Sequence, residues 1–257
     1  MTPTSAEERA VLQSVIYASL FDYPLTLAQL GDSLVAVAAD YATIAAWWRN
    51  SRLLQATVGH RDGLYFPAGR DDLVETRARR EALSRDLLHR DRRLLELVAR
   101  MPFVRLVALS GSLAHLNAER AADIDLFVIT SPGRVWLVTV GVLVMAKVLG
   151  WRKRLCLNYV ISERRLAIAP ADLFTANQII HLQPLAGYST YRRFIDANPF
   201  VSHWYPNFRF RDQGSSVGER GSGVIERVLS LGIAQAAERV CRAVYRRHLR
   251  RRAASWQ

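Results

Sequence analysis

The sequence is short of the features that mark secreted and disulfide-bonded proteins. It contains only two cysteines, Cys156 and Cys241, which do not have the spacing of a metal-binding pair. Two isolated thiols in a chain of 257 residues indicate a reducing compartment. The first residues, MTPTSAEERA, lack the basic and then apolar pattern of a secretion signal, so we expect a cytoplasmic protein.

No apolar run reaches the roughly twenty residues that a transmembrane helix needs. The nearest candidate, residues 135–151, is seventeen residues long and is interrupted by Lys147. It predicts a helix buried against a sheet. The hydrophobic content of 50% and the absence of internal repeats indicate a globular chain with one large domain or two small ones.

Positive charge is concentrated near the C-terminus. The formal net charge is +12, and seven arginines lie between positions 239 and 252, so the rest of the chain carries only +5. Residues 224–249 have the apolar spacing of an amphipathic helix. We expect this basic helix (region 224–257) to pack on its own domain, but nucleic acid, a membrane surface or a partner protein are alternative contacts.

The most informative stretch runs from Leu106 to Thr130, LVALSGSLAHLNAERAADIDLFVIT. An apolar run meets a Ser-Gly-Ser turn at 110–112, and a second apolar run carries Asp123 and Asp125. This order predicts a strand, a turn, a short helix and a second strand. Because side chains alternate along a strand, we expect the two carboxylates to share a face.

Two neighbouring carboxylates raise each other's pKa or bind a cation. Mg²⁺ is often held by one or two carboxylates together with substrate phosphates, so Asp123 and Asp125 are candidate metal ligands. Glycine permits a close backbone approach, and the N–H groups of a turn that opens a helix attract phosphate. We therefore predict that Ser110, Gly111 and Ser112 bind the phosphates.

These residues resemble the signature of the nucleotidyltransferase superfamily of DNA polymerase β type, an apolar residue with Gly-Ser followed by Asp-apolar-Asp-apolar. The resemblance implies a transferase that moves a nucleoside monophosphate from an NTP, by default ATP, to an acceptor. It also implies Mg²⁺ or Mn²⁺ as cofactor and Asp123 and Asp125 as catalytic residues. The acceptor and the preferred base stay open.

In related enzymes a later strand supplies a third carboxylate. The strand predicted over 154–162 has Asn158 instead, which can bind a metal through its amide oxygen but cannot act as a general base. Glu163, just beyond this strand, is an alternative third ligand if the register permits. The second hypothesis is therefore a catalytically weak or inactive nucleotidyltransferase-fold protein that binds nucleotide and nucleic acid or a protein partner.

Residues 1–70 have the order of a winged helix, which is three helices and a hairpin. The predicted helices cover 5–21, 26–34 and 41–50, and the hairpin covers 53–66 around an Asp-Gly turn. A winged helix binds nucleic acid through its third helix and wing. The third helix here carries one arginine and no lysine, so docking or substrate guiding is favoured over DNA binding.

The remaining chain completes an α+β architecture. We predict a winged-helix-like domain, a connecting helix (71–102), a polymerase-β-type nucleotidyltransferase mixed sheet flanked by helices (103–212), a linker (213–223) and the basic C-terminal helix. We interpret His181 as a structural histidine and Arg134 as a surface arginine, with phosphate binding as the alternative role of Arg134. Trp204, Tyr205 and Phe208 are interpreted as packing residues, with stacking on a base as the alternative.

Overall fold

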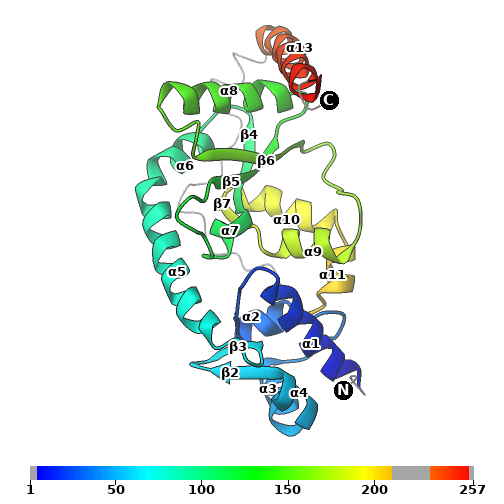
Figure 1. Cartoon of the computed structure of the whole chain (residues 1–257). Helices are drawn as coiled ribbons and strands as arrows, with labels where there is room; N and C mark the ends of the chain where they lie inside the picture. The colour runs from blue at the N-terminus through cyan, green and yellow to red at the C-terminus, as the bar shows by residue number, and fades with distance from the viewer. Residues whose placement is uncertain (1–4, 210–231, 255–257) are drawn as a thin grey trace.

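The computed structural model describes residues 5–209 and 232–254. It is a mixed α+β structure with two sheets (Figure 1). A three-stranded sheet of order β1-β3-β2 belongs to the N-terminal region, and a four-stranded sheet of order β6-β5-β4-β7 forms the centre of the molecule. Among the described residues, no helix combines the length and the apolar character that a membrane crossing needs.

The N-terminal region, residues 5–67, folds around its own apolar core. Ser5 and Thr26 cap the first two helices, each through a capping box with the residue three positions later. Leu30, Ile44 and Leu54 are fully buried in this core. The elements are α1 (Ala6–Ser19), β1 (Leu25–Thr26), α2 (Leu27–Asp32), α3 (Tyr41–Asn50), α4 (Arg52–Thr57), β2 (Val58–Arg61) and β3 (Leu64–Pro67).

The hairpin predicted over 53–66 is half wrong. Residues 52–57 form α4, because the Ser51 side chain caps this turn by accepting a hydrogen bond from the Leu54 N–H at 3.2 Å. Strand pairing begins only at Val58, and β2 and β3 run antiparallel around the Asp-Gly turn. Alternation of apolar residues over a few positions therefore did not distinguish a strand from a short, capped helix.

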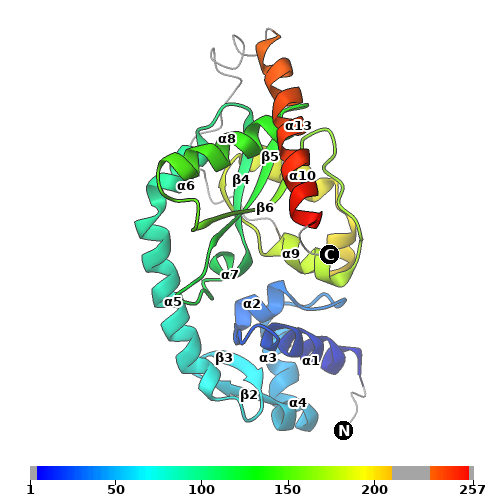
Figure 2. The same ribbon diagram turned by 45° about the horizontal axis from the view of Figure 1, so that its top comes forward.

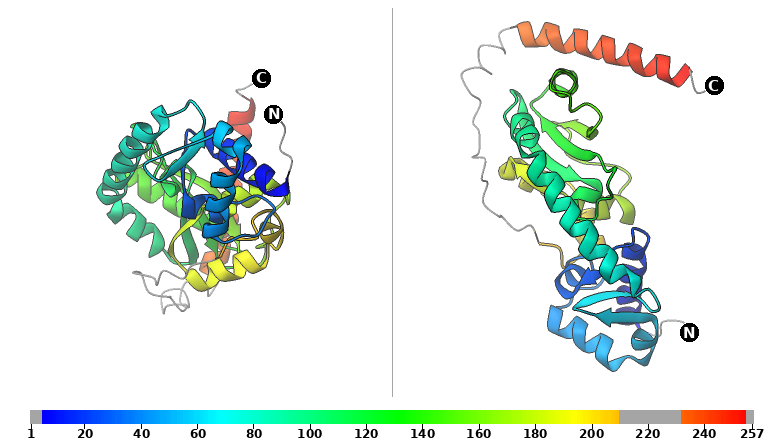
Figure 3. Two further views of the ribbon diagram at one scale, coloured as in Figure 1. Left: turned by 90° about the horizontal axis from the view of Figure 1, so that it is seen from below. Right: turned by 60° about the vertical axis from the view of Figure 1, so that its left-hand side comes forward.

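The single connecting helix predicted over 71–102 is two helices, α5 (Asp72–Arg90) and α6 (Arg92–Ala99). They are separated at Asp91, whose side chain is 2% exposed and whose carboxylate accepts hydrogen bonds from Arg154 at 2.6 Å and Arg90 at 2.7 Å. Helix α5 extends along the side of the molecule from the small sheet toward the large one (Figures 1 and 3). It connects the two parts of the chain, as the sequence predicts.

The central sheet contains β4 (Val104–Ser110), β5 (Ile124–Thr130), β6 (Leu155–Ser162) and β7 (Gln183–Ala186). Strand β5 pairs antiparallel with β4 and parallel with β6, and the parallel crossover contains α8 (Val135–Val148). The strands and helix predicted in this part of the chain are therefore confirmed. The edge strand β7, which pairs antiparallel with β4, was not predicted.

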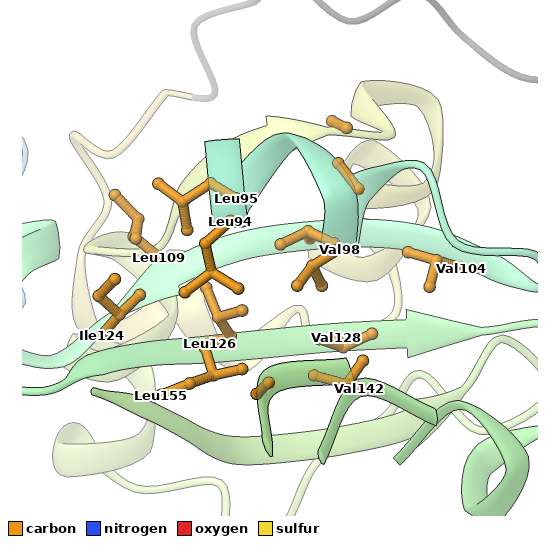
Figure 4. Packing of buried hydrophobic residues seen from close by; sticks show 14 of the residues in the cluster. Leu94, Leu95, Val98, Val104, Leu109, Ile124, Leu126, Val128, Val142 and Leu155 are labelled. Atoms are coloured by element: carbon orange, nitrogen blue, oxygen red, sulfur yellow. The ribbon is translucent and has the colours of Figure 1, made fainter. Parts of the chain in front are cut away.

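Helices cover both faces of this sheet. Helices α6 and α8 cover one face, where Leu94 and Val98 pack with Leu126 and Val142 (Figure 4). The other face is covered by α9 (Leu173–Ile180), α10 (Tyr188–Asp196) and α11 (Phe200–Trp204). Because side chains alternate along β5, Asp125 belongs to the face of Phe127 and Ile129, which is the face covered by α9.

Helix α13 (Ile233–Ala254) packs on α8 (Figure 2). The carboxylate of Glu238 accepts hydrogen bonds from the backbone N–H groups of Trp136 at 3.1 Å and Leu137 at 2.7 Å. A side chain of α13 therefore satisfies the free N–H groups at the start of α8. The predicted linker, 213–223, and residues 224–231 of the predicted basic helix lie outside the described residues.

Candidate functional site

Gly111 lies directly against the carboxylate of Asp125. Strand β4 ends at Ser110, and the short helix α7 (Gly111–Ala114) begins with Gly111 in the left-handed region at φ +63°. A Cβ atom added to Gly111 would lie 3.1 Å from Cγ of Asp125 and would overlap its Oδ2 atom. Only glycine therefore permits this approach between the turn and the acidic strand.

The two aspartates differ in their environments. Asp125 lies in register with Ser110 on β4 and Cys156 on β6, and it is partly buried, whereas Asp123 precedes β5 and is exposed. Burial raises the pKa of Asp125, and the negative charge of Asp123 raises it further. No ion pair among the described residues involves either carboxylate.

Asn158 lies beside this pair. The register of β6 against β5 shifts between Leu157 and Tyr159, so Asn158 is the extra residue of a bulge. Its Nδ2 atom donates a hydrogen bond to Oγ of Ser110 at 3.2 Å, and its Oδ1 atom accepts one from Sγ of Cys156 at 3.4 Å. Asn158 therefore connects β6 to the Ser-Gly-Ser turn across β5.

Cys156 is a site residue that the sequence did not reveal. Its thiol, which donates to Asn158, lies near the carboxyl group of Asp125, and burial together with the Asp125 charge raises the pKa of the thiol. From the sequence we predicted only that Cys156 is a reduced, free thiol. Its place beside Asp125 depends on the register between β5 and β6, for which the sequence has no local signal.

Glu163 is too far away to act as the third carboxylate, so that alternative is wrong. It follows β6 at the end opposite Cys156, seven residues along the chain, or about 23 Å at 3.3 Å per residue. Its Oε2 atom pairs instead with Nη1 of Arg193 at 3.5 Å. No group of three or more His, Cys, Asp or Glu residues within 5–209 and 232–254 could hold a metal ion by itself.

Arg134 is neither a surface arginine nor close to the acidic pair. It follows β5 at the end away from Asp125 and is 8% exposed. Its guanidinium carbon lies 5.1 Å from the centre of the Phe103 ring, and Nη1 donates a hydrogen bond to the carbonyl oxygen of Gly133 at 2.8 Å. Both interpretations of Arg134 are therefore wrong, because a cation–π contact and α13 hold it in the interior.

Exposed positive charge lies on the open side of the acidic pair. A hollow contains Asp123 together with Cys156, Arg152 and Lys153, and both basic side chains are exposed. Cationic side chains next to a carboxylate pair are suited to a polyphosphate that carries its own metal ion.

A cavity of about 270 Å³ lies on the other side of Gly111, between the N-terminal region and the central sheet. Gly111 and Ser112 line one part of it, and α1 and α9 contribute three residues each. Tyr205 also lines it and is almost fully buried, which confirms the packing interpretation for this aromatic residue.

His181 is not an isolated histidine, because its ring contacts that of His115, with 4.2 Å between the centroids and 37° between the ring planes. Both rings line the cavity. Burial lowers the pKa of His115 well below its usual range and lowers the pKa of His181 to about 4. The two imidazoles are therefore neutral at pH 7. The pair is 66 residues apart in sequence and was not predicted.

The chain matches no protein-family model, and neither a curated protein nor a solved structure matches it significantly. Function is therefore inferred from the residues around Gly111 and Asp125.

Proposed function

We propose that the protein is a metal-dependent nucleotidyltransferase that transfers a nucleoside monophosphate from an NTP, by default ATP, to an acceptor. The observation that carries this proposal is the approach of the Gly111 backbone to the carboxylate of Asp125. It brings a candidate phosphate-binding turn and a candidate metal ligand together, as the resemblance to the polymerase-β-type superfamily implies.

The residues present fit a divalent cation. Asp123 and Asp125 offer hard oxygen ligands, and neither has a cationic partner among the described residues. The charge of Asp123 lies close enough to contribute to the raised pKa of Asp125. The amide oxygen of Asn158 is a third oxygen donor nearby, and phosphate oxygens complete such sites. Bound Mg²⁺ or Mn²⁺ supplies charge neutralisation and orients the phosphate oxygens.

The chain's own residues have distinct roles in this proposal. Ser110, Gly111 and Ser112 bind phosphate oxygens through hydroxyl and backbone N–H groups, and Asn158 positions the Ser110 hydroxyl. Asp125 lies directly against Gly111, and we assign its carboxylate to take the proton from the acceptor.

The proposal is tested with α-labelled ATP, Mg²⁺ and total RNA or cell lysate. We expect the parent protein to transfer label and the Asp123→Ala/Asp125→Ala variant to transfer none. Glu163→Ala is the matched control, because it removes a carboxylate at the far end of the sheet. Equal labelling by the parent and the double variant would refute the proposal.

A second candidate function is favoured by one observation, which is that no third carboxylate joins Asp123 and Asp125 in the described parts of the chain. A catalytically weak or inactive protein would bind nucleotide through the same residues. Nucleotide binding by the parent, with no transfer from any of the four NTPs or with Mn²⁺, would favour this candidate.

We further propose that the N-terminal region is a winged-helix-like module that guides the substrate rather than binding DNA. Helix α3 has only Arg49 as a basic residue, which is little for phosphate contacts. Residues of α1 instead line the cavity beside Gly111. An electrophoretic mobility assay with duplex DNA tests this, and specific binding would contradict it.

A further inference from the structure

We propose that the cavity between the N-terminal region and the central sheet binds the acceptor, and that the acceptor is a neutral small molecule with one or two rings and a hydroxyl group. This inference rests on the proposed nucleotidyl transfer. It names the class of acceptor, which the sequence leaves open.

The location of the cavity connects it to the chemistry. Gly111 and Ser112 form part of its wall, and the carboxylate of Asp125 lies directly behind Gly111. The exposed hollow with Arg152 and Lys153 contains Asp123, and Tyr245 is the one aromatic residue among those that line it. The hollow opens on Asp123 and the cavity opens on Gly111 and Ser112, so the charged nucleotide and a neutral acceptor have separate approaches to this part of the molecule.

The wall of the cavity is uncharged. No Asp, Glu, Lys or Arg lines it, and His115 and His181 are neutral at pH 7. Aromatic rings from both parts of the chain face it, namely Tyr17, Phe21, Phe174 and Tyr205. A triphosphate or a nucleic-acid backbone is negatively charged and requires cationic partners, whereas an uncharged aromatic ring fits a wall of this kind.

Tyr17 indicates the polar group of the ligand. Its hydroxyl oxygen is buried and has no hydrogen-bond partner among the described residues, although Tyr17 lines the cavity. A buried hydroxyl without a partner costs free energy, so native structures rarely retain one. A hydroxyl group on the ligand would satisfy it. The cavity volume of about 270 Å³ suits one or two rings.

The transfer balances as follows. The acceptor hydroxyl oxygen forms a bond to the α-phosphorus of the NTP, and the bond from that phosphorus to the pyrophosphate oxygen breaks. The hydroxyl proton passes to the carboxylate of Asp125, and pyrophosphate leaves with the bonding electron pair. The products are the nucleotidylated acceptor and pyrophosphate.

Binding is tested on the full-length protein with 2-naphthol, whose fluorescence is excited outside the tryptophan band, and with naphthalene. We expect saturable binding of both probes to the parent. Ala18→Phe should weaken both strongly, because Ala18 lines the cavity and the added ring takes up much of its space. Tyr17→Phe should weaken 2-naphthol about three- to tenfold, the effect of one hydrogen bond, and leave naphthalene unchanged. Tyr65→Phe, in the small sheet, is the matched control.

Failure to bind 2-naphthol, benzyl alcohol and tryptophol, or unchanged binding to Ala18→Phe, would overturn the inference. Displacement of 2-naphthol by MgATP would assign the cavity to the nucleobase and would also overturn it. Asp125-dependent labelling of another acceptor that Ala18→Phe leaves unchanged would overturn the acceptor assignment while the nucleotidyl transfer stands. Absence of any Asp125-dependent labelling would refute the transfer itself, and the acceptor role with it, even if the probes bind.

Discussion

Gly111 and Asp125 contact each other so closely that no side chain fits between them. We predict that Gly111→Ala abolishes nucleotidyl transfer, because the new methyl group displaces the carboxylate. It should also lower the free energy of unfolding by at least about 1–2 kcal/mol, the strain of a left-handed alanine. Gly133→Ala is the matched control, since Gly133 has φ +66° but nothing within 4 Å of an added Cβ. Equal effects of the two changes on activity would contradict the prediction.

Asp125→Asn should stabilise the fold at pH 7 while removing activity. The pKa of Asp125 is higher in the folded than in the unfolded protein, so the folded state binds this proton more tightly. The resulting stabilisation of the fold is complete only below the unfolded pKa of about 3.9. That contribution is lost as the pH rises through the folded pKa. The gain of the variant over the parent in urea unfolding should therefore be present at pH 7 and vanish near pH 3.5. Asp86→Asn, at an exposed position of α5, should show no such gain.

The histidine pair predicts a loss of stability in acid. Because burial lowers the pKa of His181 to about 4, the unfolded protein binds a proton near pH 6.5 and the folded protein does not. Stability from this neutral ring is present above pH 6.5 and declines as the pH falls toward 4. Nearby Asp32 and the hydrogen bond from Nδ1 to the carbonyl oxygen of Asn177 oppose the shift only in part.

Urea unfolding at several pH values tests this prediction. Between pH 7 and pH 4 the parent should lose roughly 2 kcal/mol more than His181→Gln does. His89→Gln changes an exposed histidine and should follow the parent. Parallel pH curves for the parent and His181→Gln would contradict the prediction.

Asp91 joins the start of β6 to the break between α5 and α6. Asp91→Asn should cost about 2 kcal/mol, because it replaces a buried carboxylate that accepts charge-assisted hydrogen bonds from both Arg90 and Arg154. Asp62→Asn is the control, since its carboxylate is 75% exposed and lies 3.8 Å from Arg61. That change should cost less than about 0.5 kcal/mol in the same unfolding measurement. A similar cost for both variants would show that Asp91 contributes no more than a surface charge.

Local signals in the sequence predicted much of the fold. Capping residues such as Ser5 and Thr26 act within one helical turn, and the apolar pattern of β4, α8 and β5 extends over whole elements. Helix α4 was missed because six residues are too few to distinguish the periods of helix and strand. The break at Asp91 was missed because its cause, Arg154, is 63 residues away.

Some residues of the candidate site could likewise be predicted from local sequence signals and others could not. The Ser-Gly-Ser turn and the Asp-x-Asp pair could be recognised because each is contiguous in sequence. Cys156 and the pair of His115 with His181 could not, because their positions depend on strand register and on how the ends of α7 and α9 meet. Glu163 was a candidate only while the direction and register of β6 were unknown.

The two sides of the cavity come from different parts of the chain, and this has a consequence for how the protein can change. Replacements in α1, such as at Ala18, alter the shape of the cavity without touching the turn or the aspartates. If the cavity binds the acceptor as we propose, natural selection or directed evolution can change which compound is bound without changing the residues of the proposed reaction. Replacing α1 by a different helix should therefore change which ligand the cavity binds while leaving the central sheet unchanged.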